Sequence, residues 1–289
     1  MRLLVRWATC LVAAVCLAAP AARAEPAMWV IKDEDSTIYL LGTFHILRPA
    51  TIWNVDRIKQ ALGESTELWL EVVDDGKMDA LTGLIQKYGY DRKKPLSRRL
   101  TKEQRARLAK TAELYTFPMK LLEPMKPWYA GITLMMMPLL KAGYNPNAGV
   151  EQVLQFEARA QGDTVAALET MEEQLQMLSS LSEADQIALL MQTLGDVEEG
   201  LAYIEKVEKA WSEGDTGALE KVFVEEMKTA SAALYQRMLT DRNVRWSEKI
   251  AEMLKGSGVQ MIAVGAGHLV GPDSVQAQLA KHEIIAEQY

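Results

Sequence analysis

Cysteine is nearly absent from this sequence, and both of its cysteines, Cys10 and Cys16, lie within the first 24 residues. That stretch begins with two arginines among apolar residues, continues as an apolar run and ends in Ala-Arg-Ala, an order typical of a secretory signal peptide. We therefore predict a signal peptide over 1–24 and an exported chain over 25–289, periplasmic or secreted, from a Gram-negative bacterium. The exported chain would have no disulfide and no thiolate chemistry.

Long apolar runs and an excess of positive charge are also missing. Beyond the signal, the apolar run at 130–140 is short and contains Pro138, so we expect no membrane span after cleavage. The formal net charge of the whole chain is −7, and the signal contains arginines but no acidic residue. A surface with this balance argues against binding to nucleic acid or to an anionic membrane.

Several common catalytic motifs are absent. The sequence contains no HExxH helix and no GxSxG elbow, which excludes the usual zincin and serine-hydrolase arrangements. The glycines of "GAGHLVG" at 265–271 miss the spacing of a dinucleotide-binding loop by one residue, and too little chain follows them to build a nucleotide-binding half.

Two of the three histidines have the same local sequence. His45 lies in "LLGTFHILRP" and His268 in "AVGAGHLVGP", each with a glycine three residues before it and a proline four residues after it. Each motif follows a run typical of a strand and precedes a helical pattern. A single histidine at a strand end is most often structural, but a matched pair at neighbouring strand ends can bind one divalent metal ion.

The same order of strand, GxxH loop, helix and strand is expected at both ends of the chain, with mostly helical pattern over 77–254. We therefore predict an α/β fold in which a central mixed sheet is built from both chain ends and carries a large helical insert. Residues 25–289 would form one domain. In open sheets of this kind, ligands bind beyond the carboxyl ends of the strands, where both histidines would project.

A catalytic metal site needs a third ligand and an open position. Glu71 is the candidate, because it ends the strand that follows the first GxxH helix; the alternative is an acidic residue at a strand end in water. Two histidines and one carboxylate suit zinc, manganese, cobalt or ferrous iron.

The chain resembles the TraB/GumN family, also called TraB/PrgY/GumN, which is related to the Tiki proteins of animals. The resemblance covers nearly the whole exported chain and rests on "YLLGTFHILRP", "LWLEV", "KPW", "GVEQVLQFEARAQGDTVAALET", "RNVRW" and "VGAGHLVGPDSV". It implies an α/β fold with a duplicated GxxH unit and a metal-dependent hydrolase site; Tiki proteins are described as metalloproteases that use manganese or cobalt. The residues that match family positions are His45, Glu71, Glu151, Glu169, Arg242, Asn243 and His268.

The resulting hypothesis is an exported metal-dependent hydrolase that acts on a peptide or protein substrate. His45, Glu71 and His268 would hold the metal, and Glu151 or Glu169 would act as general base. Arg242, with Asn243 beside it, would hold a substrate carboxylate or the developing oxyanion. The alternative is a non-catalytic periplasmic binding protein for a peptide or a haem-like ligand, which would capture its ligand without turnover.

Overall fold

A computed structural model describes residues 25–73, 76 and 78–289, so the predicted signal peptide lies outside the described residues. The described chain contains one six-stranded sheet. Its strands are β1 (Met28–Lys32), β2 (Ser36–Thr43), β3 (Glu67–Leu70), β4 (Thr164–Ala167), β5 (Gly258–Gly265) and β6 (Glu287–Gln288).

The sheet is mixed and is built from both ends of the chain, which confirms the predicted fold class. Its strand order is β4-β3-β5-β2-β1-β6. The four strands from β4 to β2 are parallel, whereas β1 pairs antiparallel with β2 and β6 pairs antiparallel with β1. The carboxyl ends of β4, β3, β5 and β2 therefore meet at one edge of the sheet.

The two GxxH motifs follow adjacent strands. In the β2–β5 pair, Thr43 lies opposite Gly265, so the loops that carry His45 and His268 leave the sheet side by side. The two units end differently, because β3 pairs with β5 inside the sheet whereas the short β6 pairs with β1 at the opposite edge.

The segment between the units is mainly helical, as predicted. The α-helices are α1 (Asp56–Glu64), α2 (Met78–Gly89), α3 (Lys102–Leu114), α4 (Met119–Leu122), α5 (Pro127–Lys141), α6 (Val150–Gln161), α7 (Met171–Ser180), α8 (Glu183–Ser212), α9 (Thr216–Glu220), α10 (Met227–Ala230), α11 (Ala232–Tyr235), α12 (Asp241–Met253) and α13 (Val275–Ala280). Helix α8 continues without a break through Gly195.

Alternating side chains of β2 and β5 supply two separate cores, because neighbouring residues of a strand point to opposite faces. Tyr39 and Leu41 belong to a core that also includes residues of α1 and α6. Ile38 and Leu40 belong to a second core with residues of α12 and α13. Both faces of the sheet are thus covered, which explains the continuous apolar sequence of these strands.

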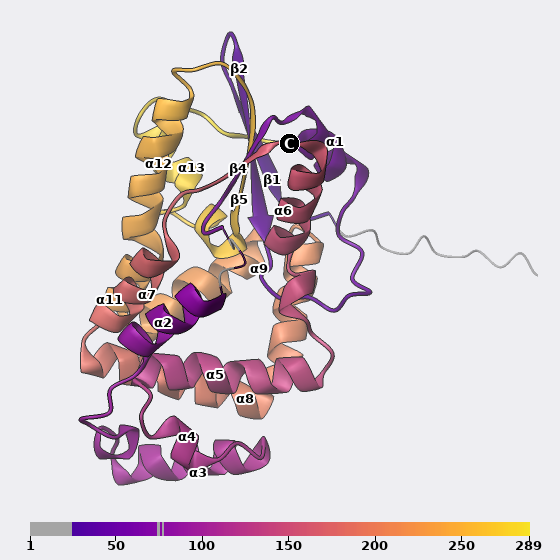
Figure 1. The fold of residues 1–289 in the computed structure, drawn as a ribbon. Coiled ribbons are helices and arrows are strands. Elements are labelled where there is room, and N and C mark those ends of the chain that lie inside the picture. The colour runs from indigo at the N-terminus through magenta and orange to yellow at the C-terminus, as the bar shows by residue number, and fades with distance from the viewer. Residues whose placement is uncertain (1–24, 74–75, 77) are drawn as a thin grey trace, which may run out of the picture.

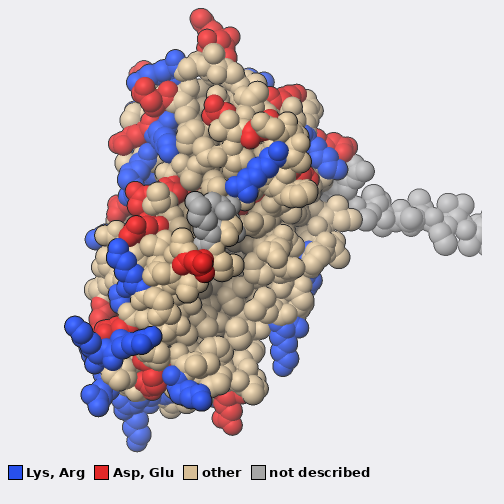
Figure 2. All heavy atoms as spheres, in the orientation of Figure 1, with Lys and Arg blue, Asp and Glu red and all other residues tan. Residues whose placement is uncertain are grey.

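A helical arm with its own core, formed by α3, α4, α5 and the first part of α8, extends from the sheet. Helices α5 and α8 pack side by side below the sheet, and α3 and α4 lie farther from it (Figure 1). Lys and Arg side chains gather at this lower end of the molecule (Figure 2). None of the described helices is both long and apolar enough to span a membrane.

The loop after β2 is fixed to the start of α6. The backbone N–H of Val150 donates to the carbonyl oxygen of Phe44 at 3.1 Å, and that of Asn145 donates to Leu47 at 2.8 Å. Gly149 makes this approach possible, since a Cβ at that position would lie 2.2 Å from the carbonyl oxygen of His45. Glycine at 149 therefore determines where the His45 loop meets α6.

Replacing Gly149 with alanine should destabilise the protein by about 1–3 kcal/mol, because the added methyl group must push the His45 backbone away. The free energy of unfolding, measured by urea denaturation followed by circular dichroism, checks this expectation. The control is Gly63→Ala in α1, where an added Cβ meets nothing within 4 Å and the substitution should be neutral or slightly stabilising. Equal stability of the Gly149→Ala variant and the natural protein would contradict the predicted clash.

Candidate functional site

All seven predicted site residues lie together at the carboxyl edge of the parallel strands. Four of them immediately follow strands, and the other three lie in the first turns of helices α6 and α12. Those after strands are His45 (β2), Glu71 (β3), Glu169 (β4) and His268 (β5), and those on helices are Glu151, Arg242 and Asn243.

Each histidine of the pair is oriented by an oxygen atom at its Nδ1. His45 Nδ1 lies 2.6 Å from Glu151 Oε1, and His268 Nδ1 lies 2.6 Å from Asn243 Oδ1. The amide of Asn243 is itself fixed, because its Nδ2 donates to the carbonyl oxygen of Asp273 at 2.8 Å. When either ring is neutral with its proton on Nδ1, Nε2 is the atom able to accept a bond or to bind a metal.

The Nε2 atoms of both histidines lie close to the carboxylate of Glu71. His268 Nε2 is 3.7 Å from Glu71 Oε1. A Cβ placed on Gly265 would lie 2.9 Å from His45 Nε2 and 3.1 Å from Glu71 Oε1. Glycine at 265 thus leaves the space in which these polar groups converge.

Glu71 is buried and is held by donors at both carboxylate oxygens. Its Oε1 accepts from the backbone N–H of Gly265 at 2.7 Å, and its Oε2 accepts from Arg242 Nη2 at 2.5 Å and from Gln174 Nε2 at 3.2 Å. These bonds fix the plane of the carboxylate.

Arg242 uses all five of its N–H donors within the protein. Nε and Nη2 both donate to Glu169, and Nη2 also donates to Glu71. Nη1 donates to the carbonyl oxygen of Met238 at 3.1 Å and contacts His268 Nε2 at 2.9 Å. In this arrangement Arg242 has no donor left for a substrate carboxylate or an oxyanion, so its evident task is to hold Glu71 and Glu169.

The pKa values of the two histidines are shifted in opposite directions. The Glu151 carboxylate raises the pKa of His45 to about 9, whereas burial lowers the pKa of His268 to about 3 despite the opposing charge of Glu71. Burial alone would raise the pKa of Glu71, but its electrostatic interactions with Arg242 and the histidines, together with the hydrogen bond from the Gly265 N–H, lower it below its usual range. At neutral pH, Glu71 is therefore ionised, His268 is neutral and His45 is protonated, so His45 must release its Nε2 proton before that nitrogen can bind a metal ion.

The site is accessible from the side of His45. The His45 side chain is 64% exposed, whereas those of Glu71 and His268 are 9% and 6% exposed. The Glu151 side chain is 14% exposed, and its Oε1 also accepts from the hydroxyl of Thr43. A ligand would thus meet His45 and Glu151 before the deeper groups.

Sequence reasoning missed three contributors to the site, namely Thr43, Gln174 and the backbone N–H of Gly265. A further contributor, Trp246, belongs to the RNVRW motif. The ring of Trp246 is 4.4 Å from that of His268, and the Arg242 guanidinium lies 4.5 Å from the same indole. Thr43 and Gly265 lie within or beside the GxxH motifs and were detectable there. Gln174 lies in an ordinary amphipathic helix, where no local signal distinguishes it.

The donor atoms fit a divalent metal ion, but their present spacing does not enclose one. Two imidazole nitrogens oriented by second partners, together with one ionised carboxylate, form a donor set typical of metalloenzymes. Among the residues that the structure describes, however, no three His, Cys, Asp or Glu side chains are spaced to hold an ion as they stand. The Arg242 guanidinium contacts both His268 and Glu71 in the same part of the site.

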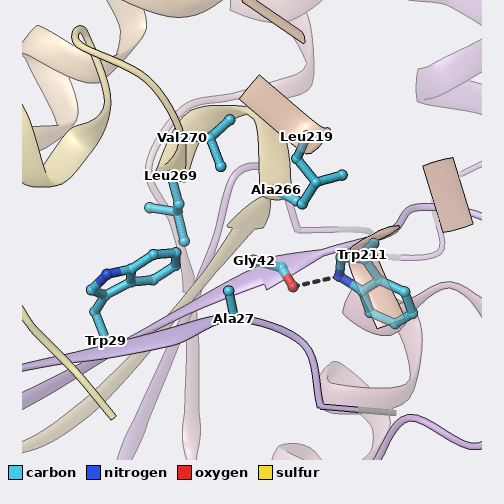
Figure 3. Close-up of a pocket in the computed structure, with 8 residues that line it drawn as sticks. All are labelled: Ala27, Trp29, Gly42, Trp211, Leu219, Ala266, Leu269 and Val270. Atoms are coloured by element: carbon cyan, nitrogen blue, oxygen red, sulfur yellow. Dashed lines mark hydrogen bonds between the residues drawn. The ribbon is translucent and has the colours of Figure 1, made fainter. Parts of the chain in front are cut away.

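A small cavity lies behind the two histidine loops, next to Gly42 and Ala266 (Figure 3). Its volume of about 10 Å³ is close to that of one water molecule, and its lining is apolar. The indole N–H of Trp211 closes it by donating to the carbonyl oxygen of Gly42 at 2.9 Å. This cavity is too small for a substrate.

Comparison with known proteins places these features in one family. The model of the TraB/PrgY/gumN family matches residues 27–288. An uncharacterized protein of Treponema pallidum (strain Nichols) is 20% identical over 274 residues, which cover 90% of this chain and 82% of that protein. The uncharacterized protein YbaP of Escherichia coli (strain K12) is 26% identical over 184 residues, 64% of this chain and 67% of that protein. No solved structure matches.

Replacing Arg242 with methionine should destabilise the protein by about 3–5 kcal/mol, because the buried carboxylates of Glu71 and Glu169 would lose their common partner. Adding Glu71→Gln and Glu169→Gln to this variant should restore much of the loss, since the buried charges are then removed as well. Urea denaturation at pH 7 measures both effects. A single variant as stable as the natural protein would show that the three charges do not depend on one another.

Proposed function

This chain belongs to the TraB/PrgY/gumN family, and from that premise and the geometry of its site we propose that it is an exported, metal-dependent hydrolase acting on peptide bonds. The observation that supports this most is the matched orientation of His45 and His268, whose Nδ1 atoms are both occupied and whose Nε2 atoms both lie near Glu71. The resemblance to the Tiki metalloproteases favours a peptide or protein substrate.

In this proposal His45, His268 and Glu71 hold a manganese, cobalt or zinc ion. Such an ion would polarise a carbonyl group and make water more acidic. To admit it, Arg242 must give up its contact with His268 while keeping its bonds to Glu71 and Glu169. Asn243 and Glu151 then keep the two imidazoles in the tautomer that exposes Nε2.

Glu151 is the better candidate for the general base. Both of its bonds, from Thr43 and His45, use Oε1, and among the described residues no donor contacts its Oε2. Both oxygens of Glu169 accept hydrogen bonds from Arg242, so its carboxylate is already occupied by a partner within the protein. We therefore assign proton transfer from water to Glu151 and a structural role to Glu169.

The second candidate function is that of a binding protein for a peptide or a haem-like ligand. One observation favours it: Arg242 already supplies a positive charge between the deep histidine and the carboxylates. A binder of this kind would retain its ligand stoichiometrically and release no product.

A peptide-library assay on residues 25–289 separates the two functions. After treatment with a chelator and reloading with manganese, cobalt or zinc singly, we expect cleavage with at least one ion and none without. Retention of intact peptides under all conditions would support the binding protein and contradict the hydrolase.

The Glu151→Gln variant should lose about 10²–10⁴-fold in turnover, because the amide cannot take up a proton. It should still bind metal, because the amide oxygen can accept from His45 Nδ1. The matched control is Glu157→Gln on the same helix, whose carboxylate contacts Asn54 and should not affect turnover. Equal turnover of the Glu151→Gln variant and the natural protein would rule out Glu151 as the base.

A further inference from the structure

The chain has a net negative charge, but its basic and acidic residues are concentrated in different regions. Residues 91–120, which form the end of the helical arm around α3 and α4, contain ten Lys and Arg but only three Asp and Glu. The remaining residues contain 22 basic and 36 acidic side chains. Figure 2 shows the basic side chains gathered at the end of the molecule where Figure 1 places α3. We call this region, 91–120, the basic tip.

Many charges of the basic tip have no acidic partner. Arg92, Lys93, Arg98 and Lys102 are exposed, and in the described part of the chain none of them forms an ion pair. Lys94 and Arg99 differ from these four, because both pair with Glu183 of α8 and so tie the tip to the rest of the arm. The first four charges are therefore available to a partner and are not needed for the fold.

One exposed leucine lies in the basic tip, and another directly follows it. Leu114 at the end of α3 is 57% exposed, and Leu121 in α4 is 48% exposed. Buried residues beneath them, among them Leu108, Ala112 and Leu122, hold both helices in place. A soluble polyanion in water gains little from leucine side chains, whereas a lipid surface accommodates basic and apolar groups together.

We propose that the basic tip docks this protein on an anionic lipid surface, with Leu114 and Leu121 entering the interfacial layer. The unpaired lysines and arginines supply attraction to the headgroups, and the leucines supply apolar contact that free phosphate or nucleic acid would not use. The same surface repels the acidic remainder of the chain. The protein therefore contacts the lipid through the end of the helical arm, and the sheet lies farther from the lipid. This proposal is independent of the hydrolase assignment.

Flotation of residues 25–289 with vesicles tests the proposal. We expect binding to phosphatidylcholine vesicles that contain 30% phosphatidylglycerol at 50 mM NaCl, much weaker binding at 500 mM NaCl, and none to pure phosphatidylcholine. Reversing four charges (Arg92→Glu, Lys93→Glu, Arg98→Glu and Lys102→Glu) should weaken binding by about 100-fold or more. The matched control reverses four exposed lysines elsewhere, Lys32, Lys59, Lys206 and Lys221, and should weaken binding far less.

A second variant, Leu114→Gln with Leu121→Gln, distinguishes a lipid surface from a soluble polyanion. On a lipid surface it should weaken vesicle binding about 10-fold and leave any binding to a short DNA duplex unchanged. Unchanged vesicle binding of the leucine variant, or equal binding by the two charge-reversed variants, would overturn the proposal, as would equal binding to neutral and anionic vesicles. Circular dichroism confirms that each variant is folded.

Discussion

The buried guanidinium of Arg242 is the constraint on which the rest of the site depends. A carboxylate removed from water is stable only when it is paired and hydrogen-bonded, and Arg242 satisfies Glu71 and Glu169 at once. It lies on α12, against one face of the sheet, while the two acids follow neighbouring strands, so its bonds tie the helix to the sheet edge. The electrostatic consequence is an ionised Glu71 beside a neutral His268.

The parallel pairing of the strands determines which residues meet in the site. Because β2, β5, β3 and β4 run in one direction, residues that are far apart in the sequence leave the sheet at the same edge. Helices on the two faces then add the groups that orient the histidines, Glu151 from α6 on one side and Asn243 from α12 on the other. Close approach requires glycine at two points, at Gly149 beneath the His45 loop and at Gly265 beneath the polar groups.

Much of this could be predicted from the sequence, because the informative patterns are local. The strands, the paired GxxH motifs and the acid after β3 lie in short segments whose periodicity or spacing is distinctive, and the family resemblance supplied the remaining site residues. The hydrogen-bond partners of those residues were harder to predict from the sequence. The bond from Gln174 to Glu71 joins two positions far apart in the sequence, and the complete use of the Arg242 donors follows only from packing. The uneven distribution of basic and acidic residues is present in the sequence, but the net charge of the chain does not reveal it.

The most direct test of the metal site is elemental analysis of residues 25–289 purified without chelator, beside a His45→Ala, His268→Ala double variant shown to be folded by circular dichroism. We expect about one manganese, cobalt or zinc ion per chain in the natural protein and none in the variant. If neither protein holds metal, even after incubation with each ion, the hydrolase proposal is contradicted. His45 and His268 would then be structural or ligand-binding groups around Arg242.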